Sequence, residues 1–202
     1  MILGIDVGGT FTDFVLLDDA GRVGIHKLLT SARDQSISIL QGIADLEAGP
    51  ETTVVHGATV ATNALLERRG ARTALVTTEG FCDVLEIGRQ TRSELYALQP
   101  SRPSPLVPGR WRFELPERVD RQGTVLVALE TGAVDAVVQQ LLDEGIESAA
   151  VCFLFSFANP AHEQIVRERI LALGGNSSPL VSLSSEVLPE YREYERASTT
   201  VI

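Results

Sequence analysis

The sequence predicts an α/β protein with a mixed sheet flanked by helices. Short apolar runs bounded by turn residues recur along the chain, as at residues 2–7, 14–17 and 149–157, and such runs are typical of strands. Apolar residues also return at helical spacing, as at residues 134–142. A chain of 202 residues with 44% hydrophobic and 22% charged residues is long enough and apolar enough to bury a core.

The charge balance limits the partners that this chain can bind. With 17 Lys and Arg against 27 Asp and Glu, the net charge of −10 disfavours nucleic acid and anionic membranes as partners. No apolar run approaches the roughly 20 residues that cross a bilayer, and no basic-then-apolar leader is present. The two cysteines, Cys82 and Cys152, lie among apolar residues, cannot form a four-thiolate zinc site, and are expected to be reduced thiols. We therefore expect a cytoplasmic protein.

The start of the chain reads as a strand, a glycine turn and a second strand. Gly8 and Gly9 allow the turn a positive φ and a close approach to a ligand, and successive amides in such a turn can form an anion-binding nest. Thr10 and Thr12 add hydroxyl donors, and Asp6 at the end of the first strand is a hard oxygen acceptor suited to Mg²⁺. These residue types together favour a site for a metal-bound polyphosphate. An ordinary β-hairpin with a glycine turn is the alternative.

The turn differs from the two most familiar phosphate motifs. A Walker loop needs a Gly-Lys-Ser/Thr ending followed by a helix, and here a strand follows. A dinucleotide fingerprint needs a third glycine that opens a helix. Asp-x-Gly-Gly-Thr between two strands resembles instead the first phosphate loop of the actin, sugar-kinase and Hsp70 ATPase superfamily. That resemblance implies a ribonuclease-H-like lobe, the actin-like ATPase fold.

A second informative stretch covers residues 56–70, which read as a strand end, a glycine turn and a helix that Gly70 closes. Thr59 could cap this helix, and helix N-termini bind anions. Thr59, Thr62 and Asn63 are small and polar where an amphipathic core helix would carry larger apolar residues. They are candidates to face a phosphate or a substrate, with plain helix capping as the alternative.

Residues 89–122 have an unusual composition, because five of the nine prolines fall in them together with seven arginines. We expect a long irregular excursion with a short β segment near residues 110–113. It is either an insertion lying over the surface or a lid that carries Arg89 and Arg92 towards an anionic ligand. Outside this excursion, the expected strands are 23–29, 53–56, 72–78, 125–129, 149–157 and 180–183, and the expected helices are 34–48, 81–88, 134–142 and 161–173.

Several charged residues are interpreted as surface residues. His26 falls on the opposite face of its strand from the apolar residues, and His162 and Glu163 sit in the first turn of a helix. The chain ends in a charged helix from Pro189 onward, in which Arg196 and its neighbours could form surface ion pairs. Since nothing closes this helix, we expect the sequence to be a fragment of a longer protein.

Four motifs in order span nearly the whole chain: residues 4–13, residues 56–71, residues 75–81 with 83–89, and residues 182–190 running on to 196–200. Taken together, they resemble the N-terminal region of the hydantoinase A/oxoprolinase family. The sequence departs from the family pattern at Ala58, where a threonine is expected, and at Cys82, where an arginine is usual.

The family resemblance implies a function. These proteins are ATP-dependent enzymes that open cyclic amides such as hydantoins or 5-oxoproline, and acetone and acetophenone carboxylase subunits are related to them. The resemblance implies ATP and Mg²⁺ as cofactors, a small cyclic amide as substrate, and a second, hydantoinase B-type subunit or domain as partner. It also implies an N-terminal domain over residues 1–183 and the start of a truncated hydantoinase A domain at residues 184–202.

The resemblance also implies roles for the residues that match the family motifs. The implied catalytic residues are Asp6, Thr12 and Asp13, with Asp6 also the metal ligand and Asp13 orienting the loop. The implied cofactor-binding residues are Gly8, Gly9, Thr10, Thr59, Thr62 and Asn63.

Three other functions remain open at this stage. A carbohydrate kinase of the same superfamily shares Asp-x-Gly-Gly-Thr, although two separated cysteines cannot supply the zinc motif that many such kinases carry. A carboxylase subunit would differ in consuming bicarbonate. A non-catalytic lobe that only binds nucleotide or assembles with a partner is the third, and it predicts Mg·ATP binding without turnover.

Overall fold

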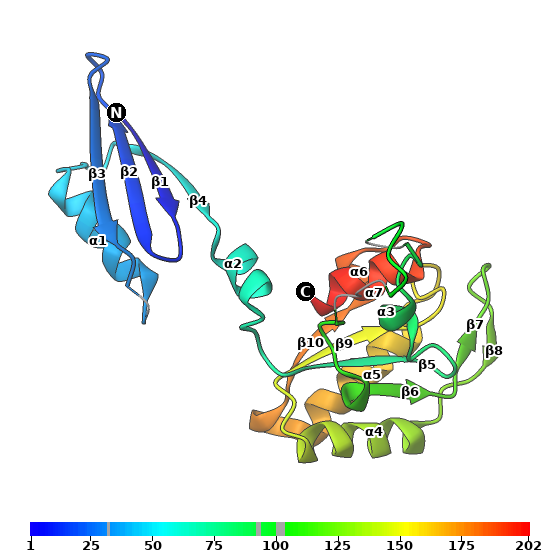
Figure 1. The fold of residues 1–202 in the computed structure, drawn as a ribbon. Helices are drawn as coiled ribbons and strands as arrows, with labels where there is room; N and C mark the ends of the chain where they lie inside the picture. Colours follow the sequence, from blue (N-terminus) through cyan, green and yellow to red (C-terminus); the bar gives the residue numbers. More distant parts are fainter. Residues whose placement is uncertain (32, 92–93, 100–103) are drawn as a thin grey trace. The chain divides into compact units, whose positions relative to one another are not determined.

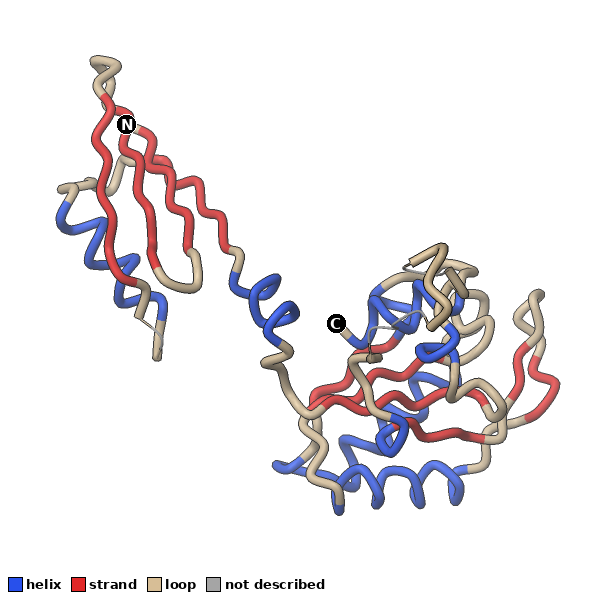
Figure 2. The backbone as a smooth tube through the Cα atoms, viewed as in Figure 1, coloured by secondary structure: helices blue, strands red, loops and turns tan. Residues whose placement is uncertain are grey.

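A computed structural model describes residues 1–31, 33–91, 94–99 and 104–202. The chain forms two compact units, Met1–Arg69 and Gly70–Ile202, which Figure 1 shows coloured along the sequence and Figure 2 shows by secondary structure. Each unit has its own sheet and its own buried core.

The first unit contains a four-stranded mixed sheet, as the sequence predicts. Its strand order is β3-β2-β1-β4, in which β4 runs parallel to β1 and the other neighbours are antiparallel. A glycine turn joins β1 to β2, and α1 covers one face of the sheet (Figure 1). The elements are β1 (Ile2–Val7), β2 (Phe11–Leu17), β3 (Val23–Leu29), α1 (Gln35–Asp45), β4 (Thr53–Ala58) and α2 (Val60–Glu67).

The core of this unit depends on close contact between α1 and Phe14. The ring of Phe14 is fully buried, and alternation along β1 and β2 sends Leu3, Ile5 and Val7 to the same face. A Cβ added at Gly42 of α1 would lie 2.1 Å from Cζ of Phe14. Glycine at this position therefore lets the ring pack directly on the helix backbone.

Gly42→Ala should destabilise the first unit by about 2 kcal/mol, because the added methyl must displace a fully buried ring in a packed core. Hydrogen exchange of the β1 amides measures the effect, since this unit contains no Trp or Tyr. Gly49→Ala is the matched control, because a Cβ there meets nothing within 4 Å. Equal protection in the two variants would contradict the packing argument.

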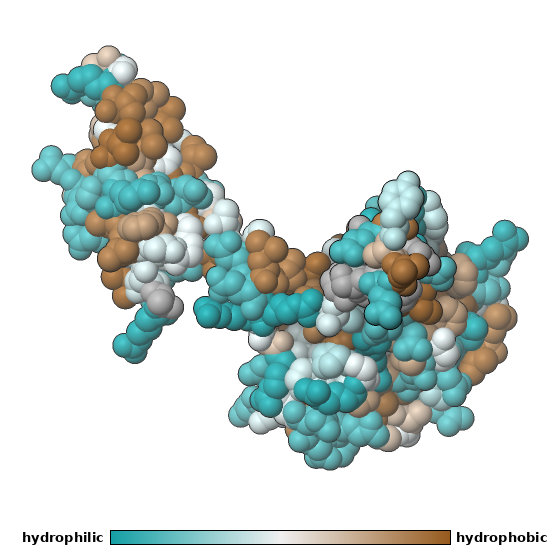
Figure 3. Space-filling model, in the orientation of Figure 1, coloured by the Kyte–Doolittle hydropathy of each residue, from teal (hydrophilic) through white to brown (hydrophobic). Residues whose placement is uncertain are grey.

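The opposite face of this sheet carries many apolar side chains that the unit leaves exposed (Figure 3). Ile25 is 78% exposed and Leu29 is 70% exposed, and Val55 is also exposed. Asp6 and Asp13 interrupt this apolar surface on β1 and β2. The two carboxylates of the predicted site thus lie on the sheet face that α1 does not cover.

The second unit is built on a four-stranded parallel sheet with strand order β10-β9-β5-β6. Helices cover both faces: α4 and α5 pack on one, and α3, α6 and α7 pack on the other (Figure 1). The elements are β5 (Thr73–Thr78), α3 (Val84–Ile87), η1 (Gly109–Trp111), β6 (Arg112–Leu115), β7 (Arg118–Val119), β8 (Val125–Val127), α4 (Thr131–Asp143), β9 (Ser148–Cys152), α5 (Ala161–Gly174), η2 (Gly175–Ser177), β10 (Leu180–Leu183), α6 (Ser184–Val187) and α7 (Glu193–Val201).

The apolar run at residues 149–157 forms a shorter strand than the sequence predicts. Strand β9 is buried on both faces, with Val151 in one core and Cys152 in the other, but it ends at Cys152. Phe155 then adopts φ 55°, which no strand allows, and residues 153–158 turn towards α5. Hydrophobicity alone could not locate this end because the turn is as apolar as the strand.

The excursion at residues 89–122 contributes strands to the second unit. The short β segment expected near residues 110–113 is confirmed as β6, an edge strand of the parallel sheet, and β7 pairs with β8 in a separate hairpin. Arg89 Nε donates to Glu195 Oε1 at 2.7 Å on α7, and Arg92 lies outside the described residues. The predicted domain start at residue 184 stays a prediction, although α6 and α7 pack within this unit.

The interpretation of His162 and Glu163 as surface residues is wrong. Glu163 is fully buried, and its carboxylate accepts hydrogen bonds from Phe153 N at 3.1 Å, Ser184 Oγ at 2.6 Å, and Ser185 N and Oγ at 2.9 and 2.6 Å. His162 Nδ1 lies 2.7 Å from Oε2 of the buried Glu117. The start of α5 therefore packs against the carboxyl ends of the strands, where these polar side chains find buried partners.

Arg196 is also buried, so its expected surface ion pair is wrong. Its side chain is fully covered, and its two terminal nitrogens donate to the carbonyls of Glu190 and Phe153 at 2.7 Å each. The amide of Phe153 thus donates to the carboxylate of Glu163, and the carbonyl of Phe153 accepts from the guanidinium of Arg196. One peptide segment separates two buried charges of opposite sign, which lowers the cost of burying each.

Among the described residues, none of the helices is both long and apolar enough to span a bilayer.

Candidate nucleotide site

Four residues form a row across the face of the first sheet that α1 leaves open. Strand register places Gly57 beside Asp6, Asp6 beside Asp13, and Asp13 beside Lys27. Lys27 Nζ lies 2.9 Å from Asp13 Oδ1, whereas Asp6 is exposed and has no ion-pair partner among the residues described. Carboxylates directly opposite each other on a sheet repel, so a cation beside Asp6 would stabilise the row.

The turn after β1 presents free amide groups. Gly8 N donates to Phe11 O at 2.9 Å and closes the hairpin. The amides of Gly9 and Thr10 have no partner within the described chain, and both residues are exposed. Two exposed donors next to a carboxylate can bind a metal-bound anion.

The expectation that the glycines adopt positive φ is wrong, because neither Gly8 nor Gly9 does so. Glycine is needed here for space: a Cβ on Gly8 would lie 3.0 Å from Phe11 O, the acceptor that closes the turn. A Cβ on Gly9 would lie 3.2 Å from Nδ2 of Asn63. The structure thus brings two of the predicted site residues, Gly9 and Asn63, close together.

Thr12 supports the turn from the buried side of the sheet. Its side chain is fully buried, and its hydroxyl lies 2.9 Å from Thr30 Oγ1, which donates to Gly8 O at 3.0 Å. Thr30 N also donates to Thr10 O at 2.9 Å. Thr30 was not predicted from the sequence, because only the pairing of β2 with β3 brings it to the turn.

Helix α2 begins beside the end of β1, since Thr59 N donates to Val7 O at 3.1 Å. Thr59 precedes the helix without a side-chain capping bond, and both Thr59 and Thr62 are exposed. The first amides of a helix lack intrahelical acceptors and attract anions. The structure therefore places these hydroxyls at the strand end that carries the turn and records no contact between them and the turn.

Gly9→Val should weaken nucleotide binding about tenfold while leaving the fold intact, because the branched side chain would cover the free amides and press on Asn63. The Kd for Mg·ATP from calorimetry measures the effect. Gly49→Val is the control, since a Cβ there meets no neighbour within 4 Å. An unchanged Kd in Gly9→Val would show that the anion does not approach this turn.

The donor set suits Mg²⁺ held together with a phosphate. In the described part of the chain no three His, Cys, Asp or Glu side chains gather to hold a metal alone. Mg²⁺ is usually bound by one or two carboxylates with waters and substrate phosphates completing its shell. Asp6, with Asp13 beside it, therefore fits a Mg²⁺ that arrives with a polyphosphate.

The two departures from the family pattern lie in different units. Ala58 ends β4 and pairs with Val7 in register, so it offers no hydroxyl at the place where a threonine is expected. Cys82 belongs to the second unit, where its amide donates to Glu114 Oε1 at 3.0 Å. Burial raises the pKa of the Cys82 thiol, with Glu114 adding to the effect.

Three comparisons with known proteins bear on the fold and the family. The gamma subunit of acetophenone carboxylase from Aromatoleum aromaticum is 35% identical over 99% of this chain and 30% of its own length. The crystal structure of an ATP-dependent caprolactamase from Pseudomonas jessenii matches the whole chain and 30% of its own, with TM-score 0.78 and 31% identity. A nucleotide-free acetone carboxylase matches the whole chain and 31% of its own, with TM-score 0.89 and 24% identity, and shows the fold alone.

The fold is an actin-like ATPase lobe, with a mixed α/β architecture and sheets flanked by helices. The sequence model of the hydantoinase/oxoprolinase N-terminal region matches residues 2–174, and the chain belongs to this family. It spans about 30% of the length of the first curated relatives it matches.

Proposed function

We propose that this chain is the N-terminal lobe of an enzyme that opens a cyclic amide, a lactam or hydantoin, with hydrolysis of ATP. The observation that carries the proposal is the exposed Asp6 beside the free amides of Gly9 and Thr10. The family and the 31% identity to an ATP-dependent caprolactamase support the substrate class. Mg²⁺ and a hydantoinase B-type partner subunit or domain belong to the same proposal.

Each residue of the site has a distinct task in this proposal. Bound ATP would supply a phosphoryl group able to activate a ring amide oxygen towards water. Asp6 binds the metal, and the free amides of Gly9 and Thr10 face the phosphates. Gly8 contributes by keeping the turn closed through its amide and by leaving space where a side chain would stand. Fixed donors of this kind stabilise developing charge without reorganisation.

The remaining candidates act around this centre. Thr12 positions the turn through Thr30, and Asp13 holds Lys27 and keeps a second carboxylate beside Asp6. The last group, Thr59, Thr62 and Asn63, faces the phosphates or the substrate from the start of α2.

An ATP-dependent carboxylase subunit is the second candidate, favoured by the 35% identity to the acetophenone carboxylase gamma subunit. The metal and phosphate contacts of Asp6 and the turn would be the same. The two reactions differ in the second reactant. In the cyclic-amide hydrolase, water opens the ring, whereas in the carboxylase, bicarbonate supplies the carboxyl group that is added to a ketone.

ATP hydrolysis by the intact protein, assayed with different substrates, tests the proposal. We expect a lactam, a hydantoin or 5-oxoproline to stimulate phosphate release and to yield a ring-opened acid. Stimulation only by a ketone with bicarbonate would establish the carboxylase, and stimulation only by a sugar would establish a kinase. Either result would overturn the cyclic-amide proposal.

A further inference from the structure

The parallel sheet of the second unit has a topological switch point. From β5 the chain first adds β6 on one side, then crosses to add β9 on the other side, followed by β10. The carboxyl ends of β5 and β9 are therefore adjacent strand ends whose connections leave in opposite directions. Ligands of open parallel sheets bind in the crevice at this position.

A pocket of about 460 Å³ opens at this switch point. Phe81 follows β5, and Leu154 and Phe155 follow β9, so each strand of the switch point contributes an apolar wall. The β7–β8 hairpin adds Arg118 and Arg121. The volume and the mixture of apolar walls with a few charges are typical of small-molecule sites.

The loop that carries Phe155 is held in a strained conformation. A bulky residue at φ 55° is a clear outlier, and such strain gathers at ligand sites. The loop is nevertheless fixed: Leu154 N donates to Thr78 Oγ1 at 3.0 Å, and Ala158 N donates to Phe155 O at 2.8 Å. The wall of the pocket is therefore preformed.

Three charged side chains that line the pocket form no ion pair within the described chain. The guanidinium of Arg118 stacks on Phe81, with its Cζ 5.3 Å from the ring centroid. Across the described residues, neither Arg118, Arg121 nor Glu193 makes an ion pair, although all three line the pocket. Asp120 also lines the pocket, but its Oδ1 accepts from the amides of Gln122 and Thr124 within the hairpin at 2.9 Å each. The site thus offers a ligand two cations and the carboxylate of Glu193.

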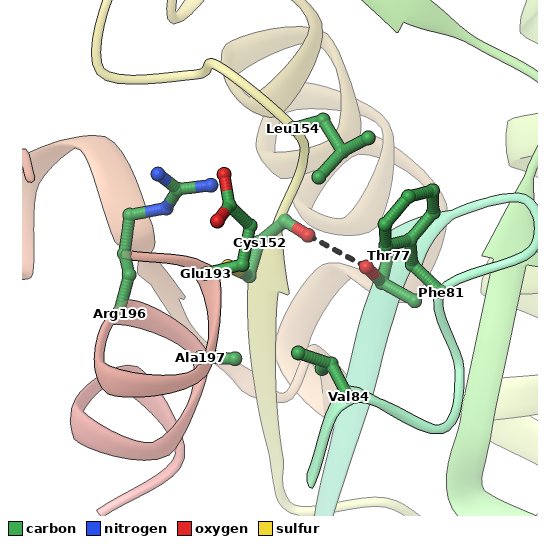
Figure 4. A pocket seen from close by; sticks show the side chains of 8 residues that line it. All are labelled: Thr77, Phe81, Val84, Cys152, Leu154, Glu193, Arg196 and Ala197. Carbon is green, nitrogen blue, oxygen red and sulfur yellow. Dashed lines mark hydrogen bonds between the residues drawn. The ribbon is translucent and has the colours of Figure 1, made fainter. Parts of the chain in front are cut away.

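The floor of the pocket holds a buried donor without a partner. A cavity of about 10 Å³ shares Phe81, Leu154 and Glu193 with the larger pocket, and the fully buried Arg196 also lines it (Figure 4). Among the residues that the structure describes, Arg196 Nε has no hydrogen-bond acceptor. The cavity can hold one water molecule or one ligand oxygen. Arg196 Nε can therefore donate a hydrogen bond to an oxygen at the floor.

Figure 4 shows the carboxylate of Glu193 pointing towards the guanidinium of Arg196, above Cys152. Burial raises the pKa of the Cys152 thiol, so this thiol adds no negative charge to that of Glu193. An ammonium group beside Glu193 would meet a carboxylate that forms no ion pair within the described chain.

We propose that this pocket binds an acyclic amino acid, with its carboxylate at Arg118 and Arg121, its ammonium at Glu193 and its carbon chain against Phe81, Leu126 and Phe155. Opening a cyclic amide produces one carboxylate and one amine on a single chain, so the ligand is of the product class. The choice of ligand class rests on the proposed function, whereas the pocket itself does not.

Calorimetric titration of the intact protein, without ATP, tests the inference with 6-aminohexanoate as the probe. We expect binding with a Kd of about 1 mM or tighter, and at least about tenfold weaker binding of hexanoate and of hexylamine, each of which lacks one charge. Arg118→Gln should weaken 6-aminohexanoate at least about tenfold. Glu193→Gln should make 6-aminohexanoate and hexanoate bind equally well.

Arg110→Gln is the matched control, because Arg110 stacks on Trp111 at 4.5 Å outside the pocket. Far-ultraviolet circular dichroism checks that each variant is folded, because the Arg110 substitution itself changes the surroundings of Trp111. Failure of the wild type to bind at about 10 mM, or equal loss in Arg110→Gln and Arg118→Gln, would overturn the inference. Ring opening without amino-acid binding would refute only this inference, and binding without any ring opening would refute only the proposed function.

Discussion

Asp6→Asn should lower ATP-dependent turnover by at least about 100-fold, the loss typical when a preorganised charged group is removed from a reacting centre. The amide keeps the size of the side chain but loses the negative charge that would hold Mg²⁺. Because the Asp6 side chain is exposed and forms no ion pair in the described chain, the substitution should leave the fold intact. Loss of the negative charge at residue 6 also removes the repulsion between this residue and Asp13 on the neighbouring strand.

Steady-state phosphate release over a range of Mg²⁺ concentrations measures this effect. Excess Mg²⁺ should partly restore a weakened metal site but not a missing catalytic group. Glu51→Gln is the control, since Glu51 is an exposed carboxylate of the same unit outside the site. Full activity in Asp6→Asn would remove Asp6 from the site.

Glu163→Ala should lower the free energy of unfolding of the second unit by about 3 kcal/mol. The substitution leaves the buried amides and hydroxyls that meet the carboxylate without an acceptor, among them Phe153 N and Ser184 Oγ. It also leaves the buried charge of Arg196 without its nearby counter-charge. Urea unfolding followed by Trp111 fluorescence measures this loss, because Trp111 is the single tryptophan and packs on the cores of this unit.

Glu168→Ala on the same helix is the matched control, since Glu168 is exposed and its loss should cost less than about 0.5 kcal/mol. The double variant with Arg196→Met tests the coupling between the two buried charges. It should cost clearly less than the sum of the single changes, because each charge is costly mainly when the other is missing. Strict additivity would show that the charges are independent.

Much of the fold follows from local pattern. The strand β10 was predicted to the residue, and α1 begins after Asp34, whose carboxylate accepts from Ser36 N at 2.9 Å as an N-cap. Apolar periodicity and caps are properties of adjacent residues, so one sequence suffices to find them. The division into two units at Arg69 was not predicted, because separate cores depend on which strands pair.

The same distinction applies to the candidate site: features of adjacent residues could be predicted, and features that depend on strand pairing could not. Asp6 and the glycine turn are recognisable because their residue types and spacing lie within one hairpin. The row formed with Lys27, and the support that Thr30 gives the turn, depend on register between strands. Glu163 was misread because a charged residue in the first turn of a helix is usually exposed, and only the packing of α5 buries it.

The binding of Mg·ATP at the first turn can be observed directly through the amide resonances of Gly9 and Thr10. In a titration of the chain with Mg·ATP, we predict that these two amides shift in the wild type, and that the shifts largely disappear in Asp6→Asn or when EDTA removes the metal. Shifts confined to other parts of the chain, or identical shifts with and without Mg²⁺, would contradict a metal-bound phosphate at this turn.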